Sequence, residues 1–64
     1  MITDRYQILS IEEGDSVRVD GKTWVVKSIE SVDSEVSELT LVDDDEHTIK
    51  MLAEDTDYIT IVFD

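Results

Sequence analysis

A chain of 64 residues holds one small domain (residues 1–64), and its 41% hydrophobic residues are enough to form a core. Cysteine is absent, which excludes disulfides and redox thiols, and no apolar run approaches the roughly 20 residues of a membrane span. Seventeen acidic residues against five basic ones give a net charge of -12, so the chain lacks the basic footprint needed to bind nucleic acid or an anionic membrane directly.

β-branched residues dominate the apolar set, with eight Val and seven Ile, and they favour short strands. At the N-terminus two interpretations stay open. Thr3 and Asp4 fit the cap of a single helical turn that runs through Leu9. Tyr6 and Ile8 equally fit an irregular edge strand.

The first clear strand covers residues 16–20 and ends in Asp20-Gly21. This dipeptide is the strongest short-range signal for a hairpin, because a type I′ turn needs positive φ at both central residues. A two-residue loop there pairs Val17 with Trp24 and turns Trp24 toward the core.

The returning strand places Val26 in the core, but Ile29 is then out of phase with it. We therefore predict a bulge near Lys27-Ser28, which would bring Ile29 back to the core. Residues 31–38 are polar and acidic apart from two valines, and are predicted to form the longest loop or a loose hairpin.

Three further strands are predicted at residues 39–42, 47–52 and 58–63, separated by acidic turns at 43–46 and 54–57. Period-two alternation turns one set of their apolar side chains inward: Leu39, Leu41, Ile49, Met51, Ile59, Ile61 and Phe63. The same alternation turns other apolar side chains outward. We predict a docking surface from these outward residues, Val25, Val42, Leu52, Tyr58 and Val62.

Five short antiparallel strands can close into a small barrel, which leaves no strand edge exposed. Residues 9–15, Leu-Ser-Ile-Glu-Glu-Gly-Asp, followed by Val17 and Val19, resemble the diverging turn and second strand of SH3-like barrels. The resemblance implies an all-β fold, a small five-stranded antiparallel SH3-like barrel. The tandem tryptophans of peptide-binding SH3 domains and the basic loops of KOW-type barrels are absent, and such a fold-level likeness implies little about function.

The sequence offers no catalytic constellation. The only histidine, His47, has no Cys and no candidate nucleophile beside it, so we predict no enzyme, no catalytic residues and no cofactor. The acidic run 43–46 could hold Ca²⁺ or Mg²⁺, but its consecutive spacing favours a solvated hairpin turn without a metal site.

Trp24 has two interpretations. As a large aromatic opposite Val17 it fits a core anchor. With Tyr6 and Tyr58 it would instead form a cage for methylated lysine, as in Tudor-type barrels. Such cages need three or four converging rings, and this chain has four aromatic residues in all, so the core position is favoured.

Abundant acids, few lysines and many Val and Thr resemble the proteins of salt-in halophiles such as haloarchaea. We therefore expect a non-enzymatic acidic interaction or structural module, cytoplasmic or in a virion, that docks onto another protein or a larger assembly in a high-salt organism or its virus. A capsid or head-tail component is one such setting, and self-association is left open. The alternative is a DNA mimic, an acidic inhibitor of a nucleic-acid-binding protein. A mimic needs its acids ranked on one face, whereas a halophile needs them everywhere.

Overall fold

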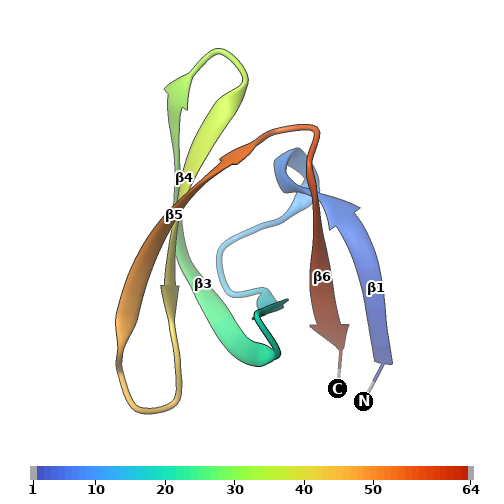
Figure 1. Ribbon diagram of the computed structural model, residues 1–64, viewed down its shortest axis with the longest axis vertical. Helices are drawn as coiled ribbons and strands as arrows, with labels where there is room; N and C mark the ends of the chain where they lie inside the picture. The colour runs from blue at the N-terminus through green and yellow to red at the C-terminus, as the bar shows by residue number, and fades with distance from the viewer. Residues whose placement is uncertain (1, 64) are drawn as a thin grey trace.

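In the computed structural model, which describes residues 2–63, the chain forms one antiparallel sheet of six strands (Figure 1). A short 3-10 turn, η1 (Ile8–Ser10), follows the first strand. The strands are β1 (Ile2–Gln7), β2 (Ser16–Val19), β3 (Lys22–Asp33), β4 (Val36–Val42), β5 (Thr48–Glu54) and β6 (Tyr58–Phe63). Their order in the sheet is β1-β6-β2-β3-β4-β5. The predicted all-β antiparallel fold is confirmed, with six strands instead of five.

The additional strand is β1. It pairs with β6 from Ile2 opposite Phe63 to Gln7 opposite Tyr58, so the edge-strand interpretation is correct for Tyr6 but not for Ile8, which lies in η1. A helical turn through Leu9 does form, but it begins after Gln7, and Thr3 and Asp4 lie in β1 and do not cap it. β1 and β5 are the two ends of the sheet order, and among residues 2–63 they do not pair with each other. The sheet is curled but not closed, so two strand edges remain where a closed barrel was expected to leave none.

The hairpin between β2 and β3 forms as predicted. Asp20 and Gly21 both have positive φ, 52° and 79°, as a type I′ turn requires. Val17 pairs with Trp24, and the register places both side chains in the core. The two-residue loop sets the pairing register, and the register fixes which face of β3 is buried.

The predicted bulge is also present, because the pairing of β3 with β4 shifts register between Val26 and Ser28. Ile29 then packs against the core. The polar stretch after it is a hairpin and not a long loop, since β3 continues to Asp33 and the chain turns at residues 34–35. This hairpin projects from one end of the sheet (Figure 1).

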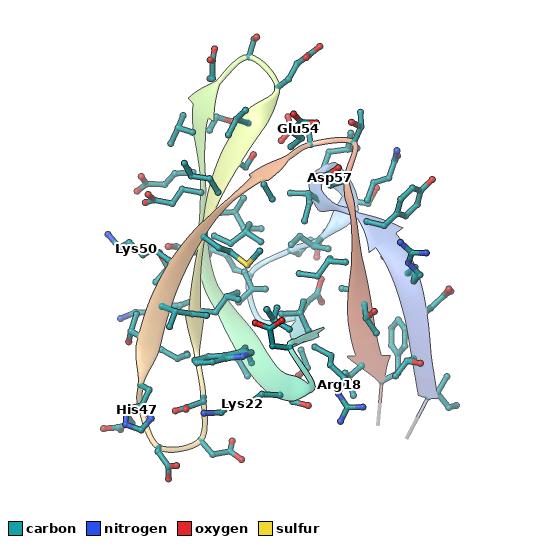
Figure 2. All side chains as sticks on the ribbon, viewed as in Figure 1. Arg18, Lys22, His47, Lys50, Glu54 and Asp57 are labelled. Carbon is teal, nitrogen blue, oxygen red and sulfur yellow. The ribbon has the colours of Figure 1, made fainter. Side chains whose placement is uncertain are left out.

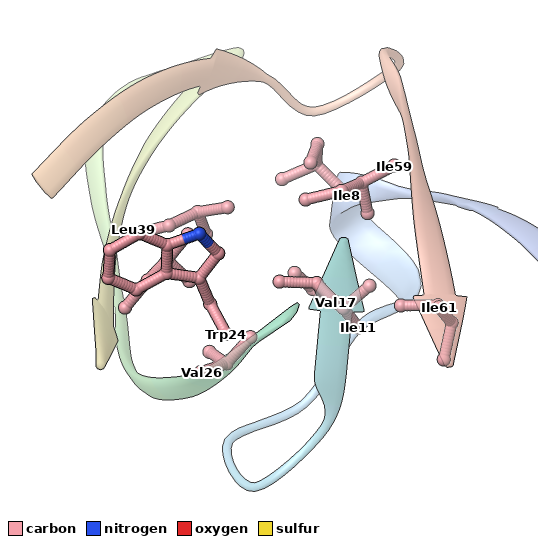
Figure 3. Close-up of a cluster of buried hydrophobic side chains, with 9 residues drawn as sticks. Ile8, Ile11, Val17, Trp24, Val26, Leu39, Ile59 and Ile61 are labelled. Atoms are coloured by element: carbon pink, nitrogen blue, oxygen red, sulfur yellow. The ribbon is translucent and has the colours of Figure 1, made fainter. Parts of the chain in front are cut away.

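The core lies inside the curl of the sheet (Figure 3). Its buried side chains come from η1, the segment after it and every strand except β1 and β5: Ile8, Ile11, Val17, Trp24, Val26, Leu39, Leu41, Ile59 and Ile61. The core interpretation of Trp24 is confirmed, because only 8% of it is exposed. Among residues 2–63, no helical segment has the length and apolarity that a membrane crossing requires.

Two residues predicted in the core are too exposed to belong to it. Ile49 pairs with buried Leu41 and so shares its face, but it lies on edge strand β5 and is 37% exposed. Phe63 is 38% exposed at the end of β6, where its cross-strand partner is Ile2 of edge strand β1. The alternation gave the right face in both cases, but Ile49 lies on an edge strand and Phe63 at the end of β6 beside an edge strand, so neither is fully covered.

Candidate binding surface

The five residues predicted to form a docking surface all lie on the outer side of the sheet. Val25, Leu52 and Tyr58 have exposed fractions of 40%, 64% and 58%, while Val42 and Val62 are half-buried. The structure divides them into two groups. Three valines share one row across the sheet, whereas Leu52 and Tyr58 border a hollow.

The three valines belong to one row of paired residues on neighbouring strands. Ser16 of β2 pairs with Val62 on one side and with Val25 on the other, and Val25 pairs with Val42 of β4. Because neighbouring strands lie about 4.8 Å apart, the valines follow one another within about 15 Å along the sheet. Sequence alternation placed each of them on the outside, but only the register shows that they are neighbours.

No acidic residue occurs in this row or in the next two rows toward the start of β6. The whole row reads Thr3, Val62, Ser16, Val25, Val42 and Thr48. The next row contains Arg5, Thr60, Arg18 and Thr23, and the third contains Gln7 and Tyr58. We call these outward positions the acid-free face. Its formally charged side chains are two arginines, in a chain that has seventeen acids.

The acids of the described chain gather in the connections and at the two ends of the sheet. In Figure 2, Glu54 and Asp57 lie at the end opposite His47, which follows the acidic turn between β4 and β5. On the outer face they return only beyond the bulge of β3, where Glu30 pairs with Glu38. The acids are therefore neither spread evenly over the surface, as expected for a halophile, nor aligned on one face, as expected for a DNA mimic.

A hollow of about 320 Å³ opens between β5 and the strands β2 and β6. β2 pairs with only three residues of β6, so the start of β6 has no partner on that side and the curled sheet is open there. Val19, Met51 and Ile59 contribute to an apolar lining, and Leu52 and Tyr58 come from the two opposite sides. This opening is what brings the second pair of predicted residues together.

The acidic turn between β4 and β5 is built around Asp43, whose side chain is only 2% exposed. One carboxylate oxygen accepts the backbone N–H groups of Asp45 and His47 at 2.9 and 2.8 Å. The other accepts Lys22 Nζ at 2.5 Å and lies 3.1 Å from His47 Nδ1. The expectation of a wholly solvated turn is wrong for this residue.

These contacts perturb the titration of Asp43. The Lys22 ammonium holds the pKa of the Asp43 carboxyl far below its ordinary value of 3.8, and the hydrogen bonds from His47 and Asp45 lower it further against the opposing effect of burial. Ligand atoms of Asp43, Asp45 and His47 lie within 4.8 Å of one another. Both oxygens of Asp43 already accept hydrogen bonds within the chain, so the cluster is explained by the contacts that hold this turn in shape.

The aromatic cage is not formed. Trp24 lies in the core, and the two tyrosines point to opposite sides of the sheet, because Tyr6 pairs with inward Ile59 while Tyr58 faces outward. The Tyr6 ring instead lies 6.0 Å from the Phe63 ring, and the Arg5 guanidinium lies 5.2 Å over the Tyr58 ring. Sequence reasoning did not select either arginine, because nothing local in the sequence shows that they share a row.

A scan against protein-family profiles finds no match to this chain, and a search of curated proteins finds none either.

Proposed function

We propose that this protein is a non-enzymatic acidic interaction module, an SH3-like fold with an open, curled sheet, that docks through its acid-free face onto another protein or a larger assembly. The setting is the cytoplasm or a virion of a high-salt organism or its virus. The observation that carries the proposal is the distribution of charge. A chain with seventeen acids keeps the described outward positions of β1, β2 and β6 free of them.

The content of the acid-free face supports docking to protein. Half-buried and exposed valines share a row there with Ser and Thr hydroxyls, and the two arginines lie one row away. Interfaces are depleted in Asp and Glu and enriched in Arg and aromatic residues relative to the rest of a surface. The face fits that composition, because it also includes exposed Tyr58.

The remaining surface supports a high-salt setting. Acids occupy nearly every connection, including the four consecutive residues 43–46. Such a surface repels itself at low ionic strength, whereas molar salt shortens the Debye length to about 3 Å and screens it. A halophilic module needs acids on the surface that faces salt water and an uncharged surface where a partner covers it. An acid-rich surface with one uncharged valine row meets both needs.

The test is a charge placed in the valine row. The protein is purified with its partners from its native source, and the complex is then reassembled with Val25→Glu. We expect at least a tenfold loss of affinity, because the new carboxylate would have to be desolvated in the interface. Val32→Glu is the matched control, since Val32 is 50% exposed but lies on the projecting part of β3. Equal binding by both variants would refute docking through this face.

A further inference from the structure

Arg5 and Arg18 are placed on either side of one residue, Thr60. Thr60 of β6 pairs with Arg5 of β1 and with Arg18 of β2, so the three side chains form one outward row. With strands about 4.8 Å apart, the two arginine Cα atoms lie about 10 Å from each other. Two long side chains at that distance can bring both guanidinium groups to a single anion above Thr60.

Within residues 2–63, neither arginine has a carboxylate within ion-pair distance, whereas Lys22 and Lys50 pair with Asp43 and Glu38. Arg5 instead lies over the Tyr58 ring at 5.2 Å. Stacking on a ring orients a guanidinium and leaves its in-plane N–H groups free to donate. Figure 2 shows Arg18 reaching away from the core beside β6.

Both arginines also contribute to the lining of the hollow between β5 and β6. Val19, Met51 and Ile59 supply apolar lining, and Leu52 and Tyr58 stand on opposite sides. Its volume of about 320 Å³ is at the lower end for ligand pockets, which is room for one or two side chains. An occupant that matches the hollow therefore has an apolar part and a negatively charged group close together.

The charge of the site limits what the anion can be. Asp57 is the one acidic residue among those lining the hollow, so two arginines leave an excess of one positive charge there. The net charge of -12 repels a polyanion, which disfavours a nucleic acid or an anionic membrane. A protein segment with a single carboxylate beside apolar side chains brings little charge and satisfies both arginines.

We infer that this hollow binds an extended segment of a partner protein in which Asp or Glu lies next to an apolar residue. The carboxylate accepts hydrogen bonds from Arg5 and Arg18 above Thr60, and the apolar side chain enters the hollow between β5 and β6. Such a segment presupposes the protein-binding function proposed above, and it occupies the row of the acid-free face next to the valine row.

The probe is a blocked pentapeptide, acetyl-Ser-Leu-Glu-Leu-Ser-amide, together with the same peptide carrying Gln for Glu. Each is titrated into the isotope-labelled full chain by NMR, at a salt concentration where circular dichroism shows the fold intact. We expect saturable shifts at the Thr60 and Tyr58 amides and at the Nε–H groups of both arginines with the Glu peptide. The Gln peptide should bind about tenfold more weakly, because it lacks the charge-assisted hydrogen bonds.

The variants identify the site. Arg18→Gln should weaken the Glu peptide about tenfold and leave the Gln peptide unchanged. Lys27→Gln is the matched control, since it removes one positive charge from an exposed position outside the hollow. Absence of saturable shifts at these residues, or equal weakening by both variants, would overturn the inference. Val42→Glu, one strand further from Arg18 than Val25, should weaken the native complex and leave peptide binding unchanged, so the two sites give separate results.

Discussion

Lys22 and Asp43 join two turns that lie side by side at one end of the sheet. Lys22 begins β3 directly after the Asp20-Gly21 turn, and its Nζ donates to Asp43 Oδ2 across a separation of 21 residues. The same ammonium lies 4.7 Å from the centre of the Trp24 ring. One cation therefore connects a core aromatic to the residue that organises the acidic turn.

This connection predicts that neighbouring acids of one turn have opposite effects on stability. Asp43→Asn should lower the melting temperature, because the ion pair with Lys22 is lost while the side chain remains the same size. Asp44→Asn should leave it unchanged or raise it, since Asp44 is exposed and adds to the repulsion around it. Thermal melts of the two variants beside the unmodified chain test this. A smaller loss for Asp43→Asn than for Asp44→Asn would contradict the structural role of Asp43.

The pKa of Asp43 also predicts a pH dependence. Its folded value lies below its unfolded value, so the carboxylate contributes stability above the ordinary pKa of 3.8 and loses that contribution as pH falls toward the folded value. The difference in unfolding free energy between the unmodified chain and Asp43→Asn should reach its largest value near pH 5 and should shrink at lower pH. Denaturant unfolding measured at a series of pH values tests this. A difference that grows on acidification would show that the sign is wrong.

The core position of Trp24 predicts a large effect of its removal. Trp24→Ala should cost about 3–5 kcal/mol, the usual cost of deleting a buried aromatic side chain. A domain of this length has a total stability of roughly 3–10 kcal/mol, so the variant should lose a large part of it. Leu9→Ala is the control, because Leu9 is 61% exposed and its loss should stay within about 0.5 kcal/mol. Circular dichroism with denaturant measures both, and a loss for Trp24→Ala no larger than that for Leu9→Ala would mean that Trp24 does not support the core.

The acidic surface predicts folding that depends on salt. Raising KCl from 0.1 M to 1 M shortens the Debye length from about 10 Å to about 3 Å, so repulsion among the carboxylates should largely disappear. The melting temperature should rise over this range. The rise should be smaller when Asp44, Asp45 and Glu46 are all neutralised, because part of the repulsion is then already absent. A melting temperature that is insensitive to KCl would remove the support for a high-salt setting.

Local patterns in the sequence were sufficient for the first hairpin. Asp20-Gly21 sets a turn of known twist, the turn sets the pairing of Val17 with Trp24, and the phase error at Ile29 reveals the bulge. Each of these steps spans only a few residues, and each is confirmed.

The remaining features depend on pairings between distant segments, which local patterns do not specify. Alternation could place Ile49 on the inner face, but not show that β5 is an edge strand that leaves it exposed. In the same way, Arg5, Arg18 and Thr60 come from three separate strands, and nothing near any of them predicts their shared row. The acid-free face and the hollow become visible only when the register is known.

The response of a native complex to salt separates a docking module from a DNA mimic. If the protein docks through apolar residues, Val62→Glu should weaken the complex, and the unmodified complex should persist in molar salt, because burial of apolar area is not screened. If the acids imitate phosphates, neutralising Asp44, Asp45 and Glu46 should abolish binding, and the complex should dissociate steeply with salt. Asp43 is left intact in this test because it holds the turn together. We expect a complex that survives molar KCl and depends on Val62. Dissociation above a few tenths molar would instead favour the mimic, because an interface held by the valine row has little charge to screen.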